Sequence, residues 1–369
     1  MKKMIFTAAM MLASAAAMAQ SGTFQIKGNV EGLPDSLVAM IGRKTENIEV
    51  KKKKFVYSKN FDKPQWVYLC DQKVIKSGAF SVIPVFAIPS ETIEMKGNFT
   101  GGVDIKGSKF YQEQDLMDEY KSQAYKDIKA LWKWYSDNVN DSNRDSIEKV
   151  VDERMEPLQK KYAADLLAYA KQHSDQECIA LLIDDLDDVK DKETLISLMA
   201  DNVKNGRMKA FYEPIFERAK KRAEMEEKAK VVQASGVEAP DFTLNDINGK
   251  PFSLSSLRGK YVVIDFWGSW CIWCIKGMPK MKEYYEKYKG KFEILGVDCN
   301  DTEAKWKAAV EKHQLPWIHV YNPKGSDVLD KYAVQGFPTK IVIGPDGKIV
   351  KTIVGEDPAF YTLLDEVLK

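Results

Sequence analysis

The chain has 369 residues, with 55 lysines and arginines against 54 aspartates and glutamates and a formal net charge of +1 at pH 7. This balance excludes a global field that would attract nucleic acid or an anionic membrane surface. The length exceeds what one ordinary core occupies, so we expect two or three domains. An apolar fraction of 44% with 11% aromatic residues excludes a disordered chain.

Residues 1–19 have the pattern of a secretory signal peptide. Lys2 and Lys3 precede an apolar run, and Ala17-Met18-Ala19 is an A-x-A cleavage pattern. The alternative, a transmembrane anchor, needs about 20 apolar residues, and this run is shorter. We therefore expect secretion across the inner membrane, a periplasmic location without a stable membrane anchor, and a compartment where disulfides persist.

Residues 20–110 are predicted to form a β-rich N-terminal domain, an antiparallel sandwich or barrel. Short apolar or alternating runs recur there between Gly, Pro, Asn and Asp residues. The lysine run Lys51–Lys54 could be a binding patch, but a solvated hairpin edge is favoured because lysines commonly blunt strand edges. The predicted strands are Phe24–Val30, Leu37–Ile41, Phe55–Tyr57, Trp66–Cys70, Val82–Ala87 and Ile93–Lys96.

Residues 111–232 are predicted to be α-helical. Apolar positions such as Tyr162, Leu166 and Tyr169 recur at helical spacing. Breaks near residues 141–143, 173–175 and 205–206 divide the region into four or five helices. The last runs from Pro214 to about Val232, and its mixed charge is typical of an exposed connecting helix.

Residues 233–369 alternate strands and helices, which predicts an α/β domain with an antiparallel edge. Tyr261–Trp267 is almost continuously apolar, as expected of a strand covered on both faces. The other predicted strands are Phe292–Asp298, Trp317–Tyr321, Ile341–Ile343 and Ile349–Val354, and the predicted helices are Ile272–Lys289, Thr302–His313, Asp327–Ala333 and Asp357–Leu368.

Cys271-Ile272-Trp273-Cys274 follows the first strand of this α/β region, where a helix begins. Two thiols at this spacing can close a small disulfide ring, and the unpaired N–H groups and dipole of a helix start favour a thiolate. A zinc knuckle is the rival interpretation. It needs two further ligands at suitable spacing, and the sequence has three histidines and no second C-x-x-C. We expect neither metal nor cofactor, and expect Cys70, Cys178 and Cys299 to be small buried hydrophobes.

Residues 237–369 resemble the thioredoxin superfamily, in particular its TlpA/ResA-like extracytoplasmic branch of thiol-disulfide oxidoreductases. The resemblance is carried by Ala239-Pro240-Asp241-Phe242, by Asp265-Phe266-Trp267 leading into the cysteine pair, by Pro279, and by Gly336-Phe337-Pro338-Thr339. It implies a thioredoxin fold. Residues 24–100 also resemble a β domain of unknown function that is often fused ahead of such modules.

The resemblance assigns roles around a redox-active disulfide formed by Cys271 and Cys274. Cys271 would be the attacking nucleophile, and Cys274 the resolving thiol, less exposed than its partner. Asp265 shares a strand face with Val263 and Trp267, so burial should raise its pKa. The resemblance makes it the proton acceptor for Cys274, whereas the alternative is a carboxylate that only caps backbone. Pro338 would be cis.

Three aromatic residues are predicted to bind substrate. Trp270 and Trp273 flank the thiols, although ordinary core packing is their alternative and is favoured for Trp267. A cis Pro338 would leave the backbone of Phe337 free to pair with an extended substrate.

The sequence departs from this branch at two places. The branch often carries a glutamate three residues after the second cysteine, whereas this chain has Gly277, which would leave Asp265 as the only carboxylate near the pair. The dipeptide Ile272-Trp273 lacks the proline of strongly reducing thioredoxins, so the direction of electron flow stays open among reductase, oxidase and isomerase. Cys299 follows a strand that ends near the site, and a redox role for it is a minor alternative.

These observations predict a periplasmic enzyme that exchanges disulfides in extracytoplasmic proteins, as a reductase or isomerase, together with a redox-partner protein. A homodimer would suit an isomerase. A peroxiredoxin-like peroxidase is one alternative, but the P-x-x-x-[ST]-x-x-C pattern around a peroxidatic cysteine is missing from residues 264–271. An interaction protein whose N-terminal region carries the main role is the other alternative.

Overall fold

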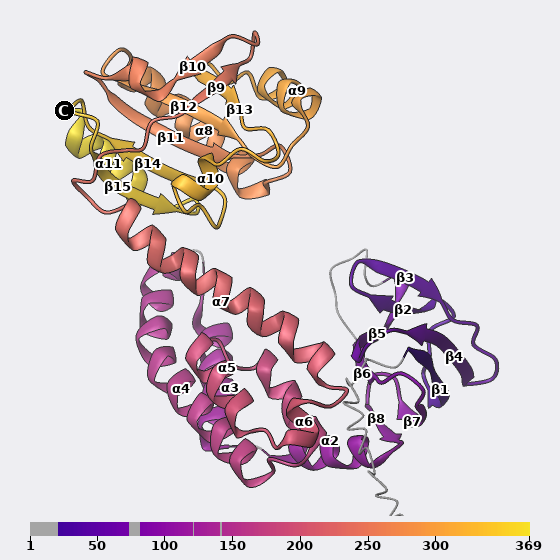
Figure 1. Ribbon diagram of the computed structural model, residues 1–369. Coiled ribbons are helices and arrows are strands. Elements are labelled where there is room, and N and C mark those ends of the chain that lie inside the picture. The colour runs from indigo at the N-terminus through magenta and orange to yellow at the C-terminus, as the bar shows by residue number, and fades with distance from the viewer. Residues whose placement is uncertain (1–20, 74–81, 121, 141) are drawn as a thin grey trace, which may run out of the picture. The chain divides into compact units, whose positions relative to one another are not determined.

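The computed structural model describes residues 21–73, 82–120, 122–140 and 142–369, so the predicted signal peptide lies outside the described residues. The chain divides into two compact units, Met1–Ala219 and Lys220–Lys369 (Figure 1). Within the described residues, every helix is too short or too polar to cross a bilayer. The predicted borders at residues 110 and 232 remain predictions.

The first unit begins with two four-stranded sheets, in the orders β4-β1-β7-β8 and β3-β2-β5-β6. Strand β1 pairs antiparallel with β4 but parallel with β7, because the chain passes through the second sheet before β7 returns beside β1. The prediction is therefore confirmed as a β-rich region but not as an antiparallel sandwich or barrel, and these strands close no barrel. Their bounds are β1 Gly22–Glu31, β2 Leu37–Ile41, β3 Lys44–Asn47, β4 Lys54–Phe61, β5 Gln65–Asp71, β6 Val82–Ala87, β7 Thr92–Asn98 and β8 Gly102–Lys106.

The lysine run Lys51–Lys54 forms an exposed tight turn between strands. The backbones of Lys51 and Lys54 exchange hydrogen bonds of 2.8 and 3.0 Å. Lys52 and Lys53, at φ 50° and 69°, adopt the left-handed conformation that such a turn requires. All four side chains are exposed, as expected of a solvated hairpin edge.

The rest of the first unit is helical. The last helix, α7, begins five residues before the predicted start at Pro214. Burial of Phe211 and Tyr212 holds its first turns despite the hydrogen bond that the proline removes. The bounds are α2 Lys109–Glu119, α3 Gln123–Asn138, α4 Arg144–Gln172, the 3₁₀ helix η1 Glu177–Asp184, α5 Val189–Leu198, α6 Asp201–Lys204 and α7 Lys209–Val232.

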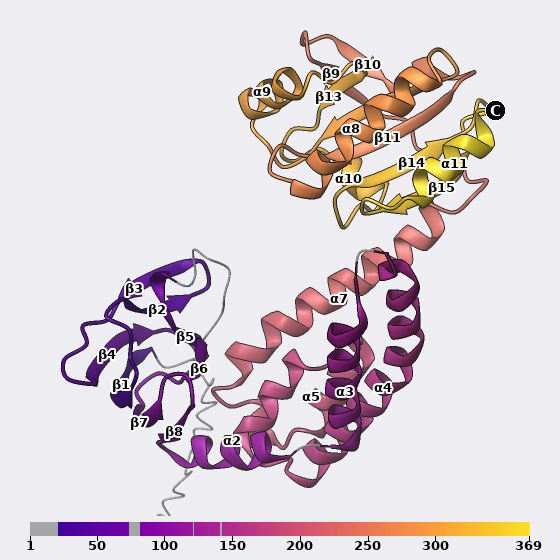
Figure 2. The ribbon, with the colours of Figure 1, turned by 180° about the vertical axis from the view of Figure 1, so that it is seen from behind.

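The second unit is built on a seven-stranded sheet in the order β10-β9-β13-β12-β11-β14-β15, a thioredoxin-like arrangement as predicted (Figures 1 and 2). The central strands β11, β12 and β13 run parallel, and β14 and β15 form the antiparallel edge. The bounds are β9 Thr243–Asp246, β10 Pro251–Ser253, the 3₁₀ helix η2 Leu254–Leu257, β11 Tyr261–Trp267, α8 Ile272–Lys287, β12 Phe292–Asp298, α9 Glu303–His313, β13 Ile318–Tyr321, α10 Val328–Lys331, β14 Thr339–Ile343, β15 Ile349–Val354 and α11 Ala359–Val367.

Strand β11 has a different core on each face. Val263 and Trp267 pack in a cluster with both cysteines of the C-x-x-C pair and with side chains of α8, α9 and α11. The alternate residues Ile264 and Phe266 belong to a second cluster that includes α10. Because side chains alternate along a strand, Asp265 lies on the face of Val263 and Trp267, the cysteine face.

Candidate functional site: a disulfide at the start of helix α8

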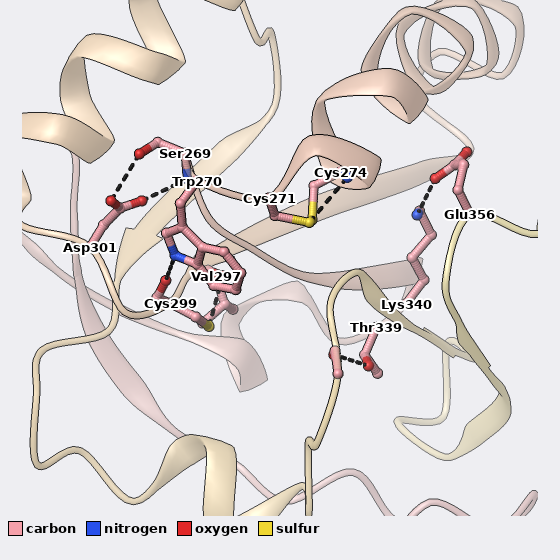
Figure 3. The surroundings of a disulfide bond; sticks show 11 residues. Ser269, Trp270, Cys271, Cys274, Val297, Cys299, Asp301, Thr339, Lys340 and Glu356 are labelled. Carbon is pink, nitrogen blue, oxygen red and sulfur yellow. Dashed lines mark hydrogen bonds and ion pairs between the residues drawn. A yellow bond between two sulfur atoms is a disulfide. The ribbon is translucent and has the colours of Figure 1, made fainter. Parts of the chain in front are cut away.

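Cys271 and Cys274 are joined by a disulfide bond, with an S–S distance of 2.08 Å (Figure 3). Cys271 is the N-cap of α8, and its Sγ accepts a hydrogen bond of 3.2 Å from the backbone N–H of Cys274. The first N–H groups of a helix have no partner within the helix and favour negative charge. A thiolate released at Cys271 would therefore be stabilised by this helix end.

The two cysteines are equally covered in the disulfide form, at 4% exposure each. The prediction that Cys274 is the less exposed of the two is therefore wrong here. Cys271 packs in the same buried cluster as Cys274.

Residues that follow β12 hold the loop between β11 and α8 in place. Asp301 accepts hydrogen bonds from the backbone N–H and the hydroxyl of Ser269, at 2.6 and 2.8 Å. The indole Nε1 of Trp270 donates to the carbonyl oxygen of Cys299 at 3.0 Å (Figure 3). These contacts fix the backbone immediately before Cys271.

The Phe337-Pro338 peptide bond is cis, as predicted. Pro338 is buried, and the ring of Phe337 packs edge-on against Trp270 with centroids 5.3 Å apart. Among the described residues, the backbone N–H and carbonyl of Phe337 have no backbone hydrogen-bond partner.

Exposed apolar side chains surround the buried sulfurs. Trp270, Ile272 and Trp273 are 51%, 62% and 58% exposed, whereas Trp267 is in the core, as predicted. The ammonium group of Lys276 lies 4.5 Å above the ring of Trp273. This surface is apolar and accessible, which suits a docking role better than core packing.

Asp265 is buried at 5% exposure, and its Oδ1 has no hydrogen-bond partner within the described parts of the chain. Burial raises the pKa of this carboxyl to about 6. The positive charge of Lys340 opposes that rise, and the negative charge of Glu356 adds to it. The predicted desolvation of Asp265 is confirmed, while its catalytic role stays a prediction.

Glu356 is a second carboxylate in this region that the sequence interpretation missed. Its Oε2 forms an ion pair of 2.8 Å with Nζ of Lys340. A Cβ atom added at Gly277 would lie 2.2–2.6 Å from the Glu356 carboxylate atoms, so this carboxylate packs directly on α8. The expectation that Asp265 is the only carboxylate near the pair is therefore wrong. The only sign of this carboxylate in the sequence is the glycine at position 277, which leaves space beside α8 but does not identify the side chain that fills it.

Cys299 belongs to the opposite core cluster from the disulfide. Its thiol is fully buried and donates to the carbonyl oxygen of Val297 at 3.3 Å. Burial raises the pKa of this thiol, which disfavours the reactive thiolate. Cys70 and Cys178 are also free and buried, as predicted.

Comparison with known proteins gives matches to the second unit. Residues 235–352 match the AhpC/TSA family. The thiol-disulfide oxidoreductase ResA of Bacillus cereus (strain ZK / E33L) is 43% identical over 122 residues, which are 33% of this chain and 70% of that protein. ResA of Bacillus subtilis (strain 168) is 36% identical over 123 residues, or 33% of this chain and 68% of that protein.

A solved structure is also similar to this unit. The crystal structure of the thioredoxin domain of a thiol-disulfide oxidoreductase from Bacteroides vulgatus has 35% sequence identity. The match covers 37% of this chain and 99% of that one, with a TM-score of 0.35.

Proposed function

Since this chain belongs to the ResA-like thiol-disulfide oxidoreductases of the thioredoxin superfamily, we propose that Cys271 and Cys274 exchange disulfides with extracytoplasmic proteins. The observation that carries the proposal is the disulfide at the start of α8, where Sγ of Cys271 accepts a helix N–H. An exchange site needs this arrangement because the attacking sulfur must be a thiolate.

In the direction of substrate reduction, the thiolate of Cys271 attacks one sulfur of a substrate disulfide. A mixed disulfide forms, and the other substrate sulfur leaves as a thiolate and takes up a proton. Cys274 then gives its proton to Asp265 and attacks Sγ of Cys271. The second substrate sulfur leaves as a thiolate and is protonated, and two electrons have passed from the cysteine pair to the substrate. A redox-partner protein restores the dithiol.

The substrate docks on the apolar surface around the disulfide. Trp270, Trp273 and Phe337 provide the ring contacts, and the unpaired backbone of Phe337 beside cis Pro338 pairs with an extended segment of the substrate. Backbone pairing gives affinity with little dependence on sequence, which suits an enzyme that acts on many proteins.

We place this exchange in the periplasm, after removal of residues 1–19. Among the directions of electron flow that the dipeptide Ile272-Trp273 leaves open, we propose reduction or isomerisation of protein disulfides. An isomerase would work as a homodimer with two sites facing one substrate.

The test is catalysed reduction of insulin disulfides by dithiothreitol. Cys271→Ser should reduce the rate to that without enzyme, because the attacking sulfur is lost. Cys274→Ser should accumulate a mixed disulfide with substrate, seen on a non-reducing gel, because the resolving thiol is missing. Cys70→Ala, in the first unit, should keep the wild-type rate. Full activity of Cys271→Ser, or peroxide consumption in place of insulin reduction, would reject the proposal.

The equilibrium of the Cys271–Cys274 pair with glutathione gives the direction of electron flow. A reduction potential of about −270 mV would identify a reductase, and one of about −180 mV an isomerase. A potential of about −120 mV would instead make the protein an oxidant and contradict our assignment.

A further inference from the structure

A lysine is buried on the cysteine face of the sheet. Lys340, in β14, is 1% exposed and lies directly opposite Asp265 of β11 in the antiparallel register. Residues opposite one another in an antiparallel pair point to the same face, as the next such pair, Val263 and Val342, confirms by sharing the disulfide's core cluster. A buried ammonium group is costly unless a negative charge compensates it, so its partner matters.

Two carboxylates could compensate Lys340, and the structure pairs it with Glu356. The 2.8 Å ion pair joins Nζ of Lys340 to Oε2 of Glu356, while the hydroxyl of Tyr361 donates to Oε1 at 2.7 Å. Figure 3 shows Lys340 and Glu356 on the opposite side of the disulfide from Asp301.

The backbone holds Glu356 in this place. The N–H of Gly355 donates to the carbonyl oxygen of cis Pro338 at 2.7 Å. The Glu356 carboxylate then occupies the volume that any side chain at Gly277 would need, one turn beyond Cys274 on α8. The ion pair is therefore built against the helix that carries the resolving cysteine.

Asp265 faces a small set of charged and titratable groups. From β14 it faces Lys340, from the segment after β15 Glu356, and from α11 Tyr361; Cys299 lies beyond β12. Burial raises the pKa of Tyr361 and that of Cys299, so both are neutral at neutral pH. Lys340 and Glu356 are the charges that act on Asp265, and they act with opposite sign.

Resting on the exchange function proposed above, we infer that Lys340 and Glu356 are positioning residues that set how firmly Asp265 holds a proton. They thereby control how readily Asp265 takes the proton of Cys274 in the resolving step. Both residues act through Asp265 and take no part in bonds to the reacting sulfurs.

The opposite charges of Lys340 and Glu356 together give Asp265 a basicity that suits acceptance of the Cys274 proton. Lys340 without Glu356 would hold Asp265 ionised but make it a weak base. Glu356 without Lys340 would raise the pKa of Asp265 further, so that a smaller fraction of Asp265 is ionised at pH 7 and able to accept the proton. With both present the pKa of Asp265 is about 6, so at pH 7 the group is mostly ionised and more basic than an ordinary aspartate. When the proton moves from Cys274 to Asp265, Sγ of Cys274 bonds to Sγ of Cys271 and the substrate sulfur leaves with the electrons of the broken bond.

The test measures the titration of the Asp265 side-chain carboxyl by ¹³C NMR in the full-length, oxidised protein. Glu356→Gln should lower the pKa of Asp265 by about one unit, because Lys340 then acts without opposition. Lys340→Met should raise that pKa by about one unit. In the double variant, the pKa of Asp265 should lie between its values in the two single variants. The double variant also contains no unpaired buried charge, so it can be measured even if Lys340→Met does not fold.

The pH profile of insulin reduction should move with the NMR titration, to lower pH in Glu356→Gln and to higher pH in Lys340→Met. A merely structural pair would change stability without moving the two profiles in opposite directions. Asp365→Asn is the matched control, because it removes one charge from the separate Lys287–Asp365 pair of this unit and should leave both profiles in place.

The inference is overturned if the pKa of Asp265 shifts in the same direction in both single variants, or in neither, while both variants still reduce insulin. The exchange function would then still hold. Failure of the wild-type protein to reduce insulin would instead reject the exchange function, whatever the titration of Asp265.

Discussion

Asp265 is a carboxyl group whose burial makes the free energy of unfolding depend on pH. Its pKa is about 6 in the folded protein, against about 3.9 in an unfolded chain. The proton is therefore held more tightly in the folded state. The stability that it contributes is fully present below pH 3.9 and is lost as the pH rises through 6, a loss of about 3 kcal/mol.

We predict that Asp265→Asn, which cannot ionise, removes this loss. Chemical denaturation of the oxidised protein should show the variant gaining stability relative to wild type between pH 4 and pH 7, by up to about 3 kcal/mol. The cost of burying the amide is the same at both pH values, so it does not change this gain. A difference that does not change between these two pH values would contradict the burial of an ionised Asp265.

Asp365→Asn serves as the control of opposite sign. Hydrogen bonds from Lys287 and Tyr288 lower the pKa of Asp365 to about 2, so its contribution to stability is present at neutral pH and lost as the pH falls through 2. This variant should therefore be less stable than wild type at pH 7.

Single residues show where prediction from sequence succeeds in this site. Cys271 and Cys274 stand in a short local motif, the family resemblance implied the cis Pro338, and strand alternation gave the face on which Asp265 lies. Each could therefore be placed without a structure. Glu356 and Lys340 could not. They reach the site from strands and loops far along the chain, and only the antiparallel register of β14 on β11 brings them beside Asp265.

At the scale of an element, Gly277 lies inside α8, where glycine normally weakens a helix. Replacing an interior glycine by alanine usually stabilises a helix by about 1 kcal/mol. Here the new Cβ would lie 2.2 Å from Oε2 of Glu356. We predict that Gly277→Ala instead lowers the free energy of unfolding, by about 1–3 kcal/mol, because the carboxylate must move in a packed region.

The Glu356→Ala background is the matched control for this helix substitution. With the carboxylate absent, Gly277→Ala should regain its ordinary stabilising effect, and a double-mutant cycle measured by denaturation gives the coupling between the two sites. Stabilisation by Gly277→Ala in the wild-type background would show that Glu356 does not fill this space.

The length and apolar pattern of each strand explain whether the sequence predicted it. β11, β12, β2 and β6 match their predicted bounds because each is an apolar run ended by polar or turn residues. Four short strands were missed, namely β3, β8, β9 and β10. β3, β8 and β10 are edge strands of their sheets, and none of the four strands is longer than five residues. Strands this short contain too few positions for alternation to stand out, even in β8, where Val103 and Ile105 pack against the core.

At the scale of the whole chain, every residue of the proposed exchange chemistry lies in the second unit, between Asp265 and Tyr361. Two positions have been given for the N-terminal border of that unit, and they can be told apart by experiment. Sequence composition predicts the border at 232/233, where mixed charge gives way to a Gly-containing turn. The contacts place it at Lys220. Two residues that precede the predicted border contact the rest of the second unit. Nε2 of Gln233, just after α7, donates to the carbonyl oxygen of Tyr332 at 2.5 Å, and Nζ of Lys228, in α7, lies 3.8 Å from Oδ2 of Asp330.

We predict that a fragment of residues 220–369 folds alone and reduces insulin at the rate of the intact protein, because it contains the whole site. A fragment of residues 234–369 lacks both of these contacts. We expect it to be less stable to denaturant by about 1–2 kcal/mol, because it has lost one hydrogen bond and one exposed ion pair. Equal stability of the two fragments would favour the border at 232/233. An unfolded or inactive 220–369 fragment would mean that the first unit completes the site.

The same fragment also tests whether the first unit recognises substrate. If it keeps insulin reduction but loses activity on folded, disulfide-bonded proteins, the first unit must recognise substrate, since the chemistry itself is then intact.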